Sequence, residues 1–157
     1  MGLKVYIGSD HRGVNFKKRI VEFLKSFGHE IADEGVFDEN VSCDYPKIAY
    51  KVAKNVVGEK GSRGILLCMS GIGQAIAANK VHGARAALCY NAEAAALSRQ
   101  HNDANILVLS AKFIRDDQVE EILKNWFTSE FEGGRHERRV NQISLIEEGK
   151  DPGNDDC

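Results

Sequence analysis

Residues 64–73 read GILLCMSGIG, a continuous apolar run that passes into a turn of small and polar residues. Such a run is typical of a β-strand buried on both faces, and the glycines suit a turn into a helix. Similar apolar runs occur at residues 4–7, 84–89 and 105–109, with a weaker one at residues 29–33. The pattern predicts five strands of a parallel sheet covered by helices on both faces.

Segments with helical spacing of apolar residues separate these runs. Helices are expected at residues 14–27, 44–57, 71–80, 91–101, 116–128 and 137–147. This alternation predicts an α/β fold, a Rossmann-like three-layer α/β/α sandwich around a five-stranded parallel sheet. We expect one domain over residues 1–148, followed by a disordered acidic tail at residues 149–157.

Composition narrows the class of protein. The 157 residues are 43% hydrophobic and 28% charged, as in an ordinary globular domain, and the net charge is −2. We therefore expect no nucleic-acid partner, because such proteins carry a basic patch. No apolar run approaches the ~20 residues of a membrane span, and no signal peptide is evident, which favours a cytoplasmic protein. The four cysteines form no CxxC pair, so a structural zinc or redox motif is disfavoured.

Ligands of such folds bind beyond the carboxyl ends of the strands. Polar residues follow the first and third expected strands and precede the fifth, and we expect the fold to gather them. These residues are Asp10, His11, Cys68, Ser70, Gly71, Gly73, His101 and Asn102.

Cys68 stands between a buried strand and a helix start. The positive end of a helix dipole lowers a thiol pKa, so this position favours thiolate. Ser70 and the backbone N–H groups of Gly71 and Gly73 could stabilise an anion beside it. The alternative is a buried core thiol followed by a simple turn. The sequence lacks Gly-Lys-Ser/Thr and the third glycine of GxGxxG, so ATP and NAD sites are disfavoured.

Other candidates also have two interpretations. His11 could bind phosphate or be a solvated loop residue. His101 could be a general acid or base, or a cation that complements a helix C-terminus. Arg135 and Arg139 are four residues apart and so share a helix face. Two guanidinium groups there suit a phosphate dianion, although a solvated charged helix start would look the same.

Several stretches, in this order and spacing, resemble the ribose-5-phosphate isomerase type B family, which also contains the galactose-6-phosphate isomerase subunits. The resemblance runs from about residue 4 to residue 148. The stretches are GSDH (8–11), DYP (44–46), GILLC (64–68), SGIG (70–73), IAANK (76–80), SRQHNDAN (98–105) and GGRH (133–136).

The resemblance implies an aldose–ketose isomerase that works through a cis-enediolate without a metal or an organic cofactor. Cys68 would be the base that moves a proton between C2 and C1. Ser70 and the backbone of residues 71–73 would hold the enediolate oxygens, and Asp10 with His101 would open the sugar ring. The resemblance also implies that Tyr45 and Asn102 contact the sugar. It implies that the phosphate is bound by His11, Arg135 and Arg139.

The resemblance also implies a homodimer, or a tetramer of such dimers, with the active site at the interface. The expected substrate pair is ribose 5-phosphate and ribulose 5-phosphate, of the pentose phosphate pathway. The alternatives are a hexose 6-phosphate isomerase acting on allose or galactose phosphate, a non-catalytic sugar-phosphate sensor, and a thiol redox protein. Three positions depart from the family: Met69 replaces a common glycine, Gln74 replaces the base of a glutamate-using branch, and Lys112 replaces an arginine.

Overall fold

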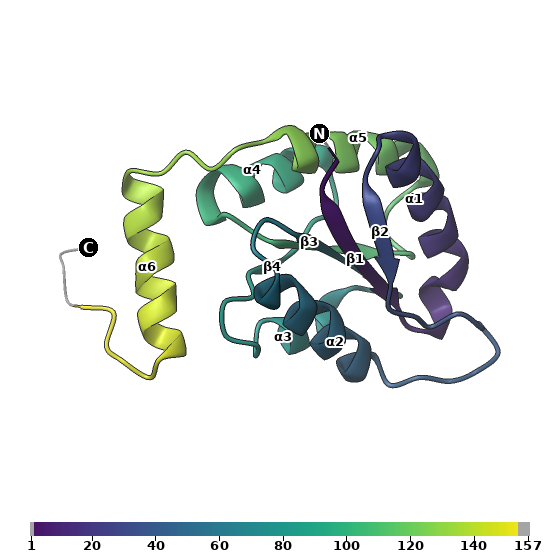
Figure 1. Cartoon of the computed structure of the whole chain (residues 1–157), viewed down its shortest axis with the longest axis horizontal. Helices are drawn as coiled ribbons and strands as arrows, with labels where there is room; N and C mark the ends of the chain where they lie inside the picture. Colours follow the sequence, from purple (N-terminus) through teal and green to yellow (C-terminus); the bar gives the residue numbers. More distant parts are fainter. Residues whose placement is uncertain (1, 154–157) are drawn as a thin grey trace.

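The computed structural model describes residues 2–153. Five parallel strands form one sheet in the order β2-β1-β3-β5-β4 (Figure 1). The strands are β1 (Lys4–Ser9), β2 (Glu30–Asp33), β3 (Arg63–Cys68), β4 (Ala86–Leu88) and β5 (Ile106–Ser110). This sheet confirms the predicted α/β fold, with β4 shorter than its apolar run suggested.

The helices follow the expected alternation. They are a 3₁₀ turn η1 (His11–Gly13) and the α-helices α1 (Val14–Ser26), α2 (Tyr45–Gly58), α3 (Ile72–Ala78), α4 (Ala92–Asn102), α5 (Asp116–Thr128) and α6 (Arg135–Glu147). Helix α6 begins two residues earlier than its sequence pattern predicted.

The central strands are apolar along their whole length because both faces of the sheet are covered. In β3, Ile65 and Leu67 join one core cluster with residues of α1, α4 and α5, whereas Leu66 joins the other with α2 and α3. All three side chains are fully buried. The burial of each side chain contributes about 1.5–3 kcal/mol. Because successive side chains point to opposite faces of the sheet, this burial stabilises the packing of helices on both faces.

The strand order creates a crevice. Strand β1 lies between β2 and β3. The chain first crosses from β1 to β2 on one side and then returns past β1 to β3 on the other side, so the direction of winding reverses at β1. Ligands of open α/β sheets bind at such a reversal, outside the carboxyl ends of the strands. Ser9 pairs with Leu67 in the register, so Asp10 and Cys68 both lie at this edge.

Helix α6 covers neither face of the sheet. It stands beside the end of α4 and is joined to α5 by an extended connection (Figure 1). After it, the N–H of Lys150 donates to the carbonyl of Leu145 at 2.9 Å. The end of the predicted tail, residues 154–157, lies outside the described residues, so the disordered tail and the domain limit stay predictions. Within residues 2–153, no helix is both long and apolar enough to cross a bilayer.

Candidate active site

A cavity of about 450 Å³ opens at the carboxyl edge of β1 and β3. That size is within the range of sites for small ligands. Its lining comes from the loops after β1 and β3 and from the segment that leads into α2. The lining residues are Asp10, His11, Arg12, Ser42, Cys43, Asp44, Tyr45, Cys68, Met69, Ser70 and Gly73.

Cys68 is the last residue of β3 and is 6% exposed. Its Sγ accepts a hydrogen bond from the backbone N–H of Gly71 at 3.1 Å. Burial nevertheless raises the pKa of the Cys68 thiol above its ordinary value, and the negative charge of Asp10 raises it further. The backbone N–H groups of Gly71, Ser70 and Gln74 lower the pKa, but by less.

The expectation that the helix start lowers the pKa of Cys68 and favours the thiolate is therefore wrong. Removal of the sulfur from water costs more than the nearby N–H groups return.

Two glycines shape this loop. Gly71 precedes α3 with φ of 85°, the left-handed region, and a Cβ there would lie 2.5 Å from Cδ1 of Leu88. At Gly73 a Cβ would lie 2.5 Å from Cζ of Tyr45. The Tyr45 ring thus lies directly against the backbone of Gly73, which brings the start of α2 over the loop that carries Cys68.

The loop after β1 is held by its own side chains. Asp10 is buried, and its Oδ1 accepts hydrogen bonds from the N–H groups of Arg12 and Gly13 at 3.1 and 3.2 Å. His11 Nδ1 accepts from the N–H of Cys43 at 3.4 Å. In a neutral imidazole that arrangement leaves the proton on Nε2, which is a donor suited to a phosphate oxygen.

The remaining candidates do not reach this cavity. Parallel strands require α4 to run back across the sheet, so His101 and Asn102 at its end lie at the amino edge, before β5. The four residue steps of β5 alone span about 13 Å. Arg135 and Arg139 are exposed on α6. The expectation that the fold of one chain gathers His101 and Asn102 with the residues around Cys68 is therefore wrong.

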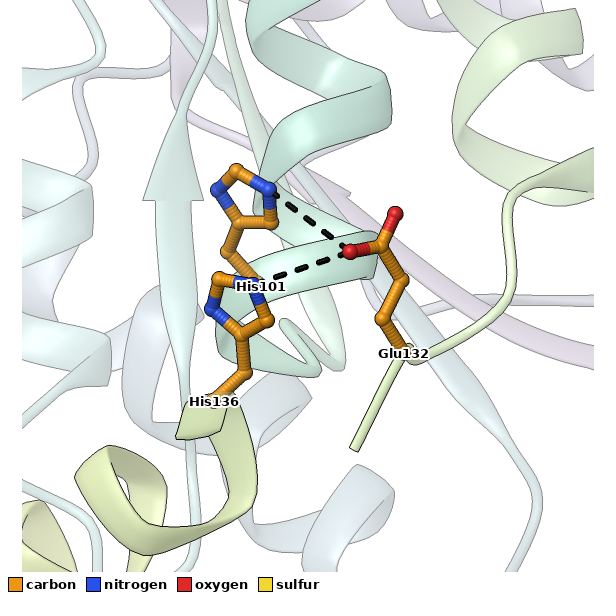
Figure 2. Close-up of side chains that lie close together, drawn as sticks. All are labelled: His101, Glu132 and His136. Atoms are coloured by element: carbon orange, nitrogen blue, oxygen red, sulfur yellow. Dashed lines mark ion pairs between the residues drawn. The ribbon is translucent and has the colours of Figure 1, made fainter. Parts of the chain in front are cut away.

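His101 instead belongs to a second cluster, with two residues that the sequence did not single out as site residues (Figure 2). Its ring stacks on that of His136 with centroids 4.1 Å apart and planes within 5°. Glu132 Oε2 lies 4.0 Å from Nε2 of His101 and 3.6 Å from Nε2 of His136. Burial, then the neighbouring His101 and Arg135, lower the pKa of His136. The GGRH stretch was the one available signal for His136.

The departures from the family have different structural settings. Met69 does not need a left-handed backbone, because Asp103 is the one non-glycine residue with positive φ among the described residues. Lys112 donates its backbone N–H to the carbonyl of Met69 at 3.1 Å and so supports the loop. Gln74 is fully buried in α3, and neither its amide nitrogen nor its amide oxygen has a hydrogen-bond partner among the described residues.

Comparisons with known proteins point in one direction. The family model described as Ribose/Galactose Isomerase matches residues 5–143. Ribose-5-phosphate isomerase B of Escherichia coli is 40% identical over 145 residues, which are 92% of this chain and 97% of that protein.

Two solved structures are similar throughout. Ribose-5-phosphate isomerase B of Clostridium thermocellum has a TM-score of 0.91 and 47% identity, covering 94% of this chain and 99% of that chain. The enzyme of Mycoplasma genitalium, solved with bound ribulose-5-phosphate, has a TM-score of 0.87 and 41% identity, with 94% and 98% covered.

Proposed function

The chain belongs to the ribose/galactose isomerase family, and we propose that it interconverts ribose 5-phosphate and ribulose 5-phosphate in the pentose phosphate pathway. The observation that carries the proposal is the pairing of Cys68 Sγ with the Gly71 N–H in a cavity of sugar-phosphate size. The similar Mycoplasma genitalium enzyme holds ribulose-5-phosphate. The thiolate form of a buried cysteine beside backbone donors is a base next to an anion site.

The reaction needs one proton moved between carbons and one between oxygens. Cys68, as thiolate, takes the proton from C2 of the open-chain aldose, which gives a cis-enediolate and a thiol. The thiol then returns the proton to C1 while the O2 proton is exchanged for one on O1. Ser70 and the N–H of Gly73 hold the two oxygens as their negative charge develops. No metal or organic cofactor enters this scheme.

The substrate-binding roles divide between the two clusters. At the Cys68 cavity, Asp10 assists ring opening, Tyr45 contacts the sugar and His11 donates to the phosphate. The residues outside the cavity would complete it from a second copy of the chain, as a homodimer with its active site at the interface. These are His101, Asn102, Arg135 and Arg139.

The position of α6 supports this assembly. The helix stands off the sheet and presents exposed Ile143 and Ile146. Both border a second cavity, of about 630 Å³, between α6 and the body of the chain. An isolated chain rarely exposes such a projecting apolar surface, and two-fold symmetry is the commonest way to cover one.

The first test is turnover of ribose 5-phosphate by the wild type and by Cys68→Ala, without added metal. We expect wild-type turnover and a loss of about 10²–10⁴-fold in the variant, the usual contribution of a general base. Turnover that survives in Cys68→Ala would assign the base elsewhere. Wild-type turnover of allose or galactose 6-phosphate, with none of ribose 5-phosphate, would favour the hexose alternative.

The shared site is tested by subunit mixing. Cys68→Ala and Arg135→Ala chains, each inactive alone, are refolded together in equal amounts. In a symmetric dimer each hybrid has one intact site, so about a quarter of the wild-type activity should return. Activity that does not return, with hybrids confirmed by native mass spectrometry, would place both residues in one chain's own site.

A further inference from the structure

We propose that His101, Glu132 and His136 form a binding site for a divalent transition-metal ion such as Zn²⁺, and that occupation of this site inhibits the enzyme. The donor atoms of these three side chains all lie within 4.8 Å of one another. Figure 2 shows both imidazoles presenting a nitrogen to the same carboxylate oxygen. The inhibitory part of the proposal rests on the proposed isomerase function, whereas the binding site does not.

The three side chains are brought together by the backbone. The N–H of Glu132 donates to the carbonyl of Gln100 at 3.0 Å, which fixes Glu132 beside the last turn of α4. The N–H of His136 donates to the carbonyl of Gly133 at 3.0 Å. The His136 side chain is only 7% exposed and is stacked on His101. The backbone therefore already holds the three side chains beside one another before a metal ion binds.

The donor set determines which ions fit. Two imidazoles with one carboxylate leave a fourth position for water, a combination that suits Zn²⁺, Co²⁺ and Ni²⁺. Mg²⁺ and Ca²⁺ prefer sites made wholly of oxygen ligands. Selectivity for the transition metals should follow from the two histidines.

The distances require small changes, and the ring orientations require larger ones. Tetrahedral zinc with bonds near 2.0–2.1 Å places its ligands about 3.3 Å apart. The nitrogen–oxygen distances here are 3.6 and 4.0 Å, so they must shorten by less than an ångström. The two stacked rings must also tilt apart, because the nitrogen lone pairs lie in the ring planes. Glu132 is half exposed, which leaves its carboxylate free to adjust.

Arg135 opposes the ion. Its Nε donates to Nε2 of His136 at 3.5 Å, using the same lone pair that a metal would need. The guanidinium also repels a cation, as does that of Arg139 on the same face of α6. A bound metal must displace Arg135 from His136, so Arg135→Ala should bind zinc more tightly than the wild type.

Inhibition follows from the role proposed for His101. A metal on Nε2 of His101 removes the lone pair that ring opening requires. It also displaces Arg135 from its resting position, although Arg135 is expected to bind the substrate phosphate. Zinc should therefore lower turnover, and a chelator should restore it.

Binding is tested on the full chain by calorimetric titration with ZnCl₂ and by the visible absorption of bound Co²⁺. The variants are Glu132→Gln and His136→Gln. The matched control is His82→Gln, because His82 is an exposed histidine whose one carboxylate partner within residues 2–153 is Glu147. We expect one ion per chain in the wild type and in His82→Gln. Affinity should fall at least tenfold in the other two variants, both of which should remain folded.

Three results would overturn the site. These are absence of binding, binding that survives in both ligand variants, and a thiolate-to-cobalt charge-transfer band that assigns the ion to a cysteine. Zinc binding without loss of ribose 5-phosphate turnover would overturn the inhibitory role. The titrations measure metal binding and do not depend on catalytic activity. They therefore distinguish a failure of the isomerase proposal from a failure of the metal site.

Discussion

The backbone N–H of Gly71 donates to Sγ of Cys68 at 3.1 Å, from a glycine held in the left-handed conformation. The bond joins the end of β3 to the start of α3, so the turn that builds the loop also holds the proposed base. Burial outweighs this bond and raises the pKa of the thiol above its ordinary value. The contact with Gly71 therefore shapes the loop and partly offsets the effect of burial on Cys68.

The alkylation rate of Cys68 should rise at a higher pH than that of an ordinary cysteine. Its pKa is raised, so the thiolate fraction keeps growing above the pH at which a free thiol has already ionised. Asp10→Asn removes a negative charge that raises this pKa, so the rise of the alkylation rate with pH should begin at a lower pH in this variant. Iodoacetamide labelling followed by mass spectrometry of the Cys68 peptide measures the pH dependence in the wild type and in the variant. A pH dependence that is unchanged in Asp10→Asn, or shifted to higher pH, would contradict the assigned charge effect.

Gly71→Ala should destabilise the protein. A left-handed alanine costs about 1–2 kcal/mol, and the contact with Leu88 adds strain of about 1 kcal/mol or more. The melting temperature should fall by about 5 °C or more for a chain of this size. The control is Gly58→Ala at the end of α2, where a Cβ meets nothing within 4 Å. An equal loss in both variants would contradict the argument from φ.

Gly73→Ala should affect substrate binding more than stability. The new Cβ would force the Tyr45 ring away from the loop, although alanine itself suits the helix. We expect KM for ribose 5-phosphate to rise about tenfold, which corresponds to about 1.4 kcal/mol. Steady-state kinetics with Tyr45→Phe as reference checks this. An unchanged KM would show that the Tyr45 ring position does not matter to the substrate.

Asp33→Ala should unfold the protein more readily, because it leaves a buried cation unpaired. Lys17 is 1% exposed, and its Nζ lies 2.6 Å from Asp33 and 2.7 Å from the carbonyl of Val36. Loss of the carboxylate should cost about 3 kcal/mol, the low end for buried pairs, because water reaches Asp33. Urea denaturation measures this.

The control is Arg19→Ala, which breaks the exposed pair with Asp116. That change should cost less than about 1 kcal/mol. Similar losses in the two variants would mean that the burial of Lys17 has no special cost.

Several elements of the fold could be predicted from local pattern. The apolar runs at β1, β3 and β5 require cover on both faces, and that condition alone implies a parallel sheet between helices. The glycine at position 71 was recognisable because a strand that turns directly into a helix needs an unusual backbone. The Cys68 side of the site follows from the same stretch of chain.

The sign of the Cys68 pKa shift was not predictable in this way. The helix start and the N–H donors are written in the sequence and both lower the pKa. The amount of water that reaches the sulfur depends on how the folded chain encloses it, and the fold also brings the negative charge of Asp10 close. Burial raises the pKa by more than the N–H donors lower it, and the charge of Asp10 raises it further.

The layers of this protein and the residue types at the end of β3 follow from local features of the sequence, because apolar period and turn chemistry are local properties. The three-dimensional fold, in contrast, is what places Cys68 and His101 at opposite ends of the strands of one sheet and brings Glu132 to two histidines. The reason is geometric. A helix that connects two parallel strands must run antiparallel to them. Which functional residues meet therefore depends on strand order and direction, and no local pattern of residues encodes these.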